Sequence, residues 1–346
     1  MFLKIKKRIE NELALYARGI DKTYPLKKLS PLLFKSIKEF ILRDGKRIRP
    51  ILFCIGYFGF SEKAPCGLYR SALSLELLHD FMLVHDDIID KSDLRRGKPS
   101  MHALLNKYLK NEKNFKFSGE DLTIVVGDVI YALALDAFLA VKENPRRKER
   151  ALRKLISAAV HTGSGEFIEL LLGTKPIEKT TKNDIYKIYD HKTANYTFAS
   201  PLAMGALLGG AKENQIKKLF DYGMHLGRAF QIKDDIIGTF SRSGQTGKSN
   251  LTDISEAKRT LLIWYAYNHS DKIRRLTIEK VFSGNSVGNK ELLKIREIIT
   301  DSGGLDYAKK EIKRLLDKAQ GSIKSLKIRK ESRGALMDFS QRILVT

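Results

Sequence analysis

The chain has 346 residues, of which 43% are hydrophobic and 30% are charged, so that a large buried core with a charged surface is possible. Its two cysteines, Cys54 and Cys66, exclude a disulfide framework and a metal site of the CxxC type. The net charge of +23 predicts attraction to a polyanion. The excess charge has four alternative explanations: binding of nucleic acid, an anionic membrane surface, small phosphorylated substrates, or a merely solvated basic surface.

Helical periodicity dominates the sequence, and we find no set of alternating strands with hairpin turns. The spacing predicts helices near residues 2–18, 31–43, 48–59, 64–91, 99–109, 121–142, 147–172, 182–210, 212–240, 256–269, 271–283, 288–301, 304–322 and 331–343. Pro201 lies in an apolar segment, where a helix start or a kink is expected. No linker separates two domains, so we expect an all-α fold with one domain over residues 1–346.

Targeting signals are not evident. Residues 1–10 alternate lysine with apolar residues and lack the apolar run of a signal peptide. We expect no apolar stretch of the roughly 18 residues that a membrane-spanning helix needs, the nearest being residues 197–211. A reducing, cytoplasmic location is therefore the expectation.

The strongest signal is an acidic cluster, FMLVHDDIID, at residues 81–90. Asp86 and Asp90 are four residues apart and lie on one helix face, whereas Asp87 lies about 100° around the helix. Like charges at this spacing destabilise an isolated helix, so the arrangement calls for a compensating cation, and hard oxygen ligands suit Mg²⁺. Taken alone, the pattern also fits an acidic helix end followed by a polar turn.

A second acidic cluster, FQIKDDIIG at residues 230–238, ends another apolar helical segment and contains Asp234 and Asp235. Two acidic clusters, each at the end of an apolar helical segment, are less likely to arise by chance than one. If they face each other across a cavity, they can hold several Mg²⁺ ions around one diphosphate. A diphosphate also needs cations, and four basic segments are candidates: residues 45–50 (GKRIRP), 94–97 (LRRG), 191–193 (HKT) and 246–248 (TGK).

Together these motifs resemble the trans-prenyltransferases, the isoprenyl diphosphate synthases. The chain matches the family's GKRxRP, DDxxD…RRG, KT, FQxxDD and GKxxxxD…K elements in order over about residues 45–260. The resemblance implies an isoprenoid synthase helical bundle around a central cavity, in a transferase of isoprenoid biosynthesis. It also implies head-to-tail condensation of isopentenyl diphosphate with dimethylallyl, geranyl or farnesyl diphosphate, with release of diphosphate.

The resemblance further implies a homodimer and about three Mg²⁺ ions per active site. The implied metal ligands are Asp86, Asp90 and Asp234, with Asp87 and Asp235 in support. The residues implied around the allylic diphosphate are Arg95, Lys192, Thr193, Gln231, Lys248 and Lys258. Those implied around isopentenyl diphosphate are Lys46, Arg49, His79 and Arg96. The catalytic set implied by these roles is Asp86, Asp87, Asp90, Arg95, Lys192, Asp234 and Lys248.

Three segments depart from the family pattern. Glu166 and Glu169 stand where Gln and Asp are frequent, residues 249–251 read SNL in place of PVG, and Gly238 replaces a third Asp of many farnesyl synthases.

Product length is expected to depend on the face of the helix that precedes Asp86. Phe81 and Met82 lie about 6–7.5 Å below the first carboxylate. One aromatic at this place, without an insertion in DDxxD, resembles the archaeal-type geranylgeranyl diphosphate synthases and implies a twenty-carbon product. A farnesyl product, a product of twenty-five carbons or more, and a floor built by another helix stay as alternatives.

Two other functions are alternatives to that of a prenyl diphosphate synthase. A noncatalytic subunit of such an enzyme usually loses one acidic cluster, and both are present here. A basic protein that binds nucleic acid or membranes would account for the lysine- and arginine-rich segment at residues 309–333 but not for the aspartates. We therefore expect no nucleic-acid partner, although weak association with an anionic membrane is compatible with an amphiphilic product.

Overall fold

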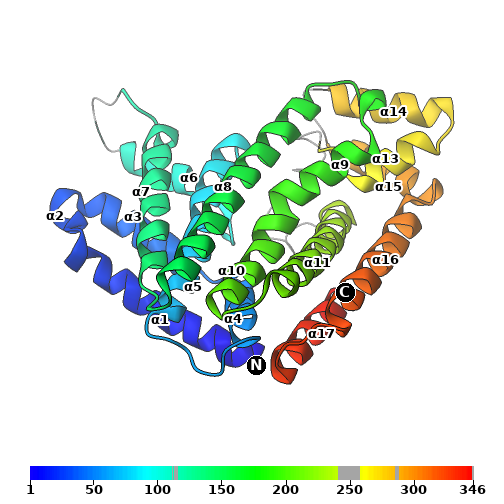
Figure 1. Ribbon diagram of the computed structural model, residues 1–346. Helices are drawn as coiled ribbons and strands as arrows, with labels where there is room; N and C mark the ends of the chain where they lie inside the picture. The colour runs from blue at the N-terminus through cyan, green and yellow to red at the C-terminus, as the bar shows by residue number, and fades with distance from the viewer. Residues whose placement is uncertain (111, 113–115, 241–257, 285–287, 345–346) are drawn as a thin grey trace. The chain divides into compact units, whose positions relative to one another are not determined.

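The computed structural model describes residues 1–110, 112, 116–240, 258–284 and 288–344. Helices make up nearly all of the described secondary structure, so the predicted all-α fold is confirmed (Figure 1). The chain divides into two compact units, which are described separately. Unit 1 consists of Met1–Leu152 and Met204–Gly210, and unit 2 consists of Arg153–Ala203 and Ala211–Thr346. The single domain over residues 1–346 stays a prediction.

Unit 1 is built around one helix that is buried on most of its circumference. This helix is α5, and α1, α3, α4, α6 and α7 pack against it. The elements of this unit, coloured from blue to green in Figure 1, are α1 (Phe2–Thr23), α2 (Leu26–Leu29), α3 (Pro31–Ile41), α4 (Ile48–Phe58), α5 (Leu68–Ile89), β1 (Leu94–Arg95), β2 (Lys98–Pro99), α6 (Met101–Leu109) and α7 (Gly119–Leu139). Two helices, α8 (Pro145–Gly173) and α10 (Ser200–Leu208), have residues in both units.

Local sequence signals set several of these helices. Helix α1 packs against α5 and α4 and carries a stripe of buried residues at helical spacing, namely Ile5, Ile9, Leu13, Tyr16 and Ile20. Helix α3 begins with a serine cap at Ser30 followed by Pro31, whose fixed φ suits the first helical position. Helix α7 begins with a capping box between Ser118 and Asp121.

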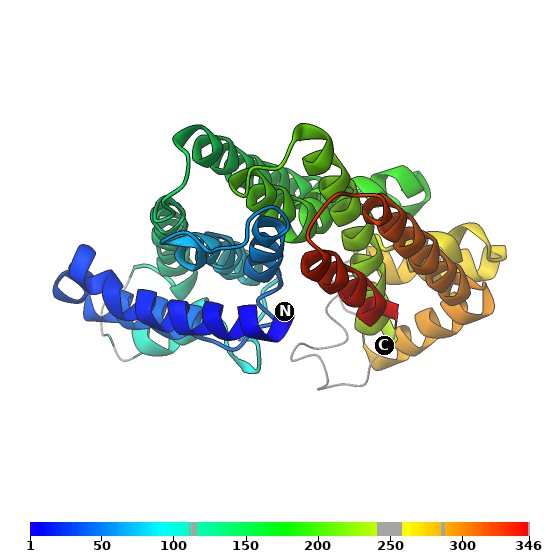
Figure 2. The ribbon, with the colours of Figure 1, turned by 60° about the horizontal axis from the view of Figure 1, so that its bottom comes forward.

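Unit 2 is organised around α11 (Glu213–Phe240), which packs against the π-helix η2 (Tyr189–Ala199) and against α16 (Gly304–Lys324). Its other elements are η1 (Ile177–Lys179), α9 (Lys182–Ile188), α13 (Leu261–Asn268), α14 (Lys272–Ser283), α15 (Asn289–Asp301) and α17 (Lys330–Leu344). Figure 2 shows α16 and α17 as two neighbouring helices at the C-terminal end of the chain. The Tyr222 hydroxyl of α11 donates to the Leu336 carbonyl of α17 at 2.7 Å, which ties this end of the chain to the core of the unit.

The prediction of one helix over residues 182–210 is wrong in detail, because α9 and α10 are separated by the π-helix η2. The Ser200 N–H donates to the Asn195 carbonyl, five residues back, as a π-helix requires. Pro201 follows at once and has no N–H, so it cannot extend this hydrogen-bond pattern. The expected start or kink at Pro201 is thereby confirmed.

Other differences from the prediction are small. The short helix α2, the 3₁₀ turn η1 and the two-residue strands β1 and β2 are too brief to show a period in sequence. Helix α13 begins at Leu261, after a cap by the Thr260 hydroxyl, and residues 256–257 of the predicted helix lie outside the described part.

One prediction about hydropathy is wrong. Helix α7 contains an 18-residue window of mean hydropathy 2.0, so by length and composition it can span a membrane. It lies along α5 and also contacts α3 and α6, and 44% of that window is buried. A buried core helix gives the same composition, and packing against α5 accounts for the apolar side of α7.

Candidate active site

Three aspartates lie at the C-terminal end of α5 in unit 1. The Asp90 N–H donates to the Asp86 carbonyl at 2.8 Å, so the two residues are one helical turn apart and their side chains share a face. Both are half-buried, whereas Asp87 is fully buried. The structure therefore separates the predicted acidic cluster into two partly accessible carboxylates and one that belongs to the interior.

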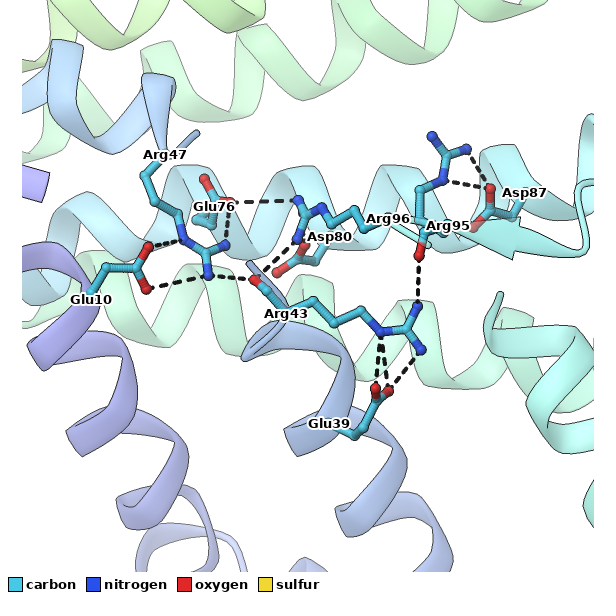
Figure 3. A network of polar contacts seen from close by, with 9 residues as sticks. All are labelled: Glu10, Glu39, Arg43, Arg47, Glu76, Asp80, Asp87, Arg95 and Arg96. Atoms are coloured by element: carbon cyan, nitrogen blue, oxygen red, sulfur yellow. Dashed lines mark hydrogen bonds and ion pairs between the residues drawn. The ribbon is translucent and has the colours of Figure 1, made fainter. Parts of the chain in front are cut away.

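Arg95 occupies the inner side of this cluster. Its Nε donates to Asp87 Oδ1 at 2.7 Å (Figure 3). Its Nη2 lies 3.2 Å from Asp86 Oδ2. Burial alone would lower the pKa of Arg95, but the hydrogen bond to Asp87 and the charges of Asp86 and Asp90 raise it above its ordinary value. In this structure Arg95 thus holds the first acidic cluster together, a role that the sequence did not indicate.

The segment GKRIRP contributes side chains of two different kinds. Lys46 is exposed and Arg49 is half-buried, whereas the Arg47 side chain is only 1% exposed. Arg47 donates to Glu76 at 2.7 Å, to Glu10 at 2.9 Å and to the Arg43 carbonyl at 2.6 Å (Figure 3). Arg47 is therefore an internal residue between an exposed cation, Lys46, and a half-buried one, Arg49.

His79 lies on α5 among several guanidinium groups. Burial and the nearby charges of Arg49, Arg96, Arg95 and Arg47 lower the pKa of His79 well below its ordinary value, so its imidazole is neutral. Arg96 extends from the β1–β2 turn back along α5 towards Glu76 and Asp80 (Figure 3). Three of the four residues predicted for isopentenyl diphosphate, Arg49, His79 and Arg96, therefore lie in one neighbourhood of unit 1.

The second acidic cluster lies in unit 2 near the end of α11. Asp235 is buried and accepts hydrogen bonds from the Tyr189 hydroxyl and, at 2.9 Å, from Gln231 Nε2. Thr193 Oγ1 in turn donates to Gln231 Oε1 at 2.6 Å. Asp234 is exposed, so the carboxylate predicted as a metal ligand is the accessible one, and Asp235 joins α11 to η2.

A close approach of two helices makes these contacts possible. A Cβ atom added to Gly227 of α11 would lie 2.4 Å from the Cα of Ala194 in η2, a distance that real Cβ atoms do not show. Only glycine allows the two backbones to come so near. This approach brings Thr193 within hydrogen-bond reach of Gln231.

Lys192 of η2 lies between the two glutamates that depart from the family pattern. Its Nζ is 2.6 Å from Glu166 Oε2 and 2.5 Å from Glu169 Oε2, both on α8. A Cβ on Gly165 would lie 2.8 Å from the backbone nitrogen of Lys192, so glycine again permits the close approach of α8 and η2. The glutamates were noticed in the sequence, but their ion pairs with Lys192 could not be inferred from it.

A sequence profile of the polyprenyl synthetase family matches residues 30–299. The chain belongs to the polyprenyl synthetase family. The short chain isoprenyl diphosphate synthase of Methanocaldococcus jannaschii is 28% identical over 88% of this chain and 84% of its own length. The geranylfarnesyl diphosphate synthase of Aeropyrum pernix is 30% identical over 81% of this chain and 83% of its own length.

Solved structures agree with this polyprenyl synthetase assignment at the level of the fold. A geranylgeranyl pyrophosphate synthase from Corynebacterium glutamicum, complexed with isoprenyl diphosphate and magnesium, is similar with a TM-score of 0.91 at 24% identity, covering 100% of this chain and 99% of the other. As a polyprenyl synthetase the chain is a transferase with prenyl diphosphate synthase activity, which confirms the predicted class of enzyme. Its recognition as a trans-prenyltransferase from sequence motifs is likewise confirmed.

The donor set of this polyprenyl synthetase fits Mg²⁺ shared with a substrate. Among the described residues no group of three or more His, Cys, Asp or Glu side chains lies close enough to hold a metal ion by itself. Asp86 and Asp90 still offer hard carboxylate oxygens on one accessible face. Mg²⁺ typically binds through one or two carboxylates and completes its shell with water and phosphate oxygens, so this small donor number is suitable.

The polyprenyl synthetase residues predicted to limit product length lie on α5, next to α7. The ring of Phe81 is 5.1 Å from that of Tyr131 on α7 and 4.7 Å from that of His85 one turn further along α5. Phe81 and Met82 are both half-buried. Tyr131 was not singled out in the sequence, because its proximity to Phe81 depends on the pairing of the two helices.

Two further predicted lysines, Lys248 and Lys258, follow α11 in the chain. Lys258 is half-buried just before α13, and its carbonyl accepts from the Thr260 N–H at 3.1 Å. Lys248 and the departure at residues 249–251 lie outside the described residues.

Proposed function

We propose that this isoprenyl diphosphate synthase makes geranylgeranyl diphosphate by head-to-tail condensation of isopentenyl diphosphate with allylic diphosphates. The observation that carries the proposal is the arrangement along α5. One part of this helix, at His79, lies among arginines suited to a diphosphate, and its end carries the carboxylates Asp86 and Asp90. At 1.5 Å per residue the two parts are about 10 Å apart, which suits two substrates side by side.

The basic neighbourhood in unit 1 is proposed to bind isopentenyl diphosphate. Lys46, Arg49 and Arg96 supply positive charge, and neutral His79 supplies a hydrogen bond without adding to the repulsion among the arginines. The allylic diphosphate is proposed to contact Arg95, Lys192, Thr193, Gln231, Lys248 and Lys258. The hydrogen bond from Thr193 to Gln231 orients two of these polar groups before any substrate arrives.

Mg²⁺ is the proposed cofactor, with about three ions per site held by Asp86, Asp90 and Asp234. When bound, Mg²⁺ neutralises charge on the leaving diphosphate. Arg95 keeps Asp86 in position, and Tyr189 and Gln231 fix Asp235 and with it the end of α11 beside Asp234. Asp86 and Asp235 are thus held by protein contacts before any substrate binds, which limits their rearrangement during reaction.

The chemistry of the condensation needs no protein base. The allylic carbon–oxygen bond breaks, and the double bond of isopentenyl diphosphate attacks the resulting allylic cation. The product then loses a proton to the departing diphosphate. The protein contributes orientation, charge stabilisation and exclusion of water.

A twenty-carbon product is proposed from the Phe81 region. Phe81 packs against Tyr131, so two aromatic rings stand together on the α5–α7 face where the growing chain would end. Curated relatives carry the names geranylgeranyl, short chain and geranylfarnesyl diphosphate synthase, a range that includes this length.

We further propose that the chain acts as a cytoplasmic homodimer with one catalytic domain over residues 1–346. Weak association with anionic membranes is compatible with this, because the product is amphiphilic and the net charge is +23.

The proposal is tested with labelled isopentenyl diphosphate, several allylic primers and chromatographic sizing of products, with and without chelator. Activity should disappear with chelator and return with Mg²⁺. Asp86→Ala, Asp90→Ala and Asp234→Ala should each lower turnover by at least about 10²-fold, the scale of losing a main electrostatic stabiliser. Asp93→Asn, an exposed aspartate close to the first cluster, should have little effect. Near-normal turnover in Asp86→Ala would contradict the metal-binding role.

A further inference from the structure

Helix α5 buries two acidic side chains one turn apart, before the three aspartates at its end. Glu76 is 2% exposed and Asp80 is fully buried, and their neighbours along the helix are mainly apolar. Burying a carboxyl group away from water is costly unless it is paired or hydrogen-bonded. No role proposed so far uses either residue, so their retention in the interior needs a separate reason.

The partners of these two carboxyls differ. Glu76 accepts a hydrogen bond from Arg47 at 2.7 Å, whereas neither oxygen of Asp80 has a hydrogen-bond partner among the described residues. The nearest cation to Asp80 is Arg96, whose Nη2 lies 3.6 Å from Asp80 Oδ1 and 3.7 Å from Glu76 Oε1 (Figure 3). Asp80 therefore attracts Arg96 without accepting any of its N–H groups.

The turn that carries Arg96 has an unusual backbone. Arg96 has φ of 55°, in the left-handed region that side chains other than glycine seldom adopt. Consecutive arginines of this turn are anchored at separate points of α5, Arg95 at Asp87 and Arg96 at the Glu76–Asp80 pair (Figure 3). The two anchors offset the strain of the turn and set where Arg96 lies.

Electrostatic repulsion makes the second anchor necessary. Arg96 shares its surroundings with Arg47 and Arg49, which are close enough to affect the same buried carboxyl. Without a nearby negative charge, repulsion among these cations would favour an Arg96 side chain turned away into solvent.

The protonation of Asp80 is linked to the same contact. Burial and the neighbouring Glu76 raise the pKa of Asp80 well above its ordinary value, whereas Arg96, Arg47 and Arg49 act to lower it. Arg96 thus favours the ionised carboxyl. By reciprocity of linkage, the ionised carboxyl favours Arg96 in this position.

We propose that Asp80 is a positioning residue for isopentenyl diphosphate, which together with Glu76 holds the Arg96 guanidinium beside α5 with the N–H groups of Nη2 left to the diphosphate, while Nη1 donates to the Arg43 carbonyl at 3.5 Å. This inference rests on the proposed function, in which Arg96 binds isopentenyl diphosphate. Asp80 itself touches no substrate and acts only through Arg96.

The test is a double-mutant cycle at pH 8.5, which favours the ionised carboxyl, with Asp80→Asn, Arg96→Ala and the combined variant. Asp80→Asn should raise KM for isopentenyl diphosphate about 10-fold, within the range measured for coupled charge pairs, and leave kcat and primer KM within about twofold. In the Arg96→Ala background the same substitution should add less than about twofold. Glu12→Gln serves as the control, because Glu12 pairs with Arg70 and with none of the arginines near Asp80.

The outcomes separate this inference from the function on which it rests. An unchanged KM in Asp80→Asn, or an equal effect with and without Arg96, would show that Asp80 does not act through Arg96. If Arg96→Ala itself left KM for isopentenyl diphosphate unchanged, the substrate assignment would fail as well. Thermal unfolding of each variant verifies that it is folded, and Asp80→Ser repeats the measurement if the asparagine variant does not fold.

Discussion

Arg47 lies between two proposed substrate-binding residues, Lys46 and Arg49, yet the structure predicts that its replacement damages stability first. The Arg47 side chain is 1% exposed, and Arg47→Ala would remove its hydrogen bonds to Glu76, Glu10 and a backbone carbonyl. Glu76, itself 2% exposed, would be left as a buried carboxylate without that hydrogen bond. Breaking a buried ion pair by removing one partner costs about 3–5 kcal/mol, so we expect the free energy of unfolding to fall by this amount.

The assay is chemical or thermal unfolding of the purified protein. For a chain of this size, a loss of this magnitude corresponds to a fall in Tm of about 4–7 °C. Lys46→Ala is the matched control: Lys46 is exposed, so stability should change by less than about 0.5 kcal/mol while KM for isopentenyl diphosphate rises. An Arg47→Ala protein as stable as the wild type, or equal destabilisation by both substitutions, would refute the division of this segment into internal and substrate-binding residues.

Three further results are expected. Phe81→Ala should remove one of the two rings on the α5–α7 face and lengthen the main product by one or more five-carbon units, as sized by chromatography; an unchanged distribution in a folded variant would place the floor elsewhere. Lys192→Ala should raise primer KM or lower turnover and leave KM for isopentenyl diphosphate near wild type, whereas an effect on isopentenyl diphosphate alone would be inconsistent with its proposed role. The hydrogen bond from Arg314 lowers the pKa of Glu311 to about 2, so its stabilisation is present above pH 4.5 and is lost as pH falls through about 2. Glu311→Gln should therefore be less stable than wild type at pH 7, with the difference in urea unfolding shrinking towards pH 2, and a constant difference would contradict this.

The helical architecture could be predicted because apolar residues repeat at helical spacing within each segment. Residues such as Ile5, Ile9 and Leu13 of α1 repeat at helical spacing and are buried together. The π-helix η2 could not be predicted in this way, since it coincides with a close approach to α11 at Gly227, a contact between segments distant in sequence. The strands β1 and β2 have two residues each and show no period.

The candidate site was predictable to the extent that its residues form motifs. Spacing places Asp86 and Asp90 on one helix face, the resemblance to the trans-prenyltransferases adds Asp234, and the structure leaves all three at least partly accessible. Spacing cannot show which carboxylate of a pair is accessible and which is internal. Asp235 is internal because Tyr189 and Gln231 donate hydrogen bonds to it, whereas its neighbour Asp234 is exposed. A weaker signal was available for Glu76 and Asp80, two acids one turn apart in an apolar helical run.

The π-helix has a consequence for how the chain tolerates changes in length. Each turn of η2 holds more residues than an α-helical turn, so loss of one residue within Tyr189–Ala199 could be absorbed by conversion to α-helix without unfolding the segment. Each residue of an α-helix turns the chain by about 100°, so such a shortened segment would point Thr193 or its replacement away from Gln231. A deletion in η2 should therefore reduce catalytic activity much more than folding stability. A deletion in α14 should reduce activity only to the extent that it reduces stability.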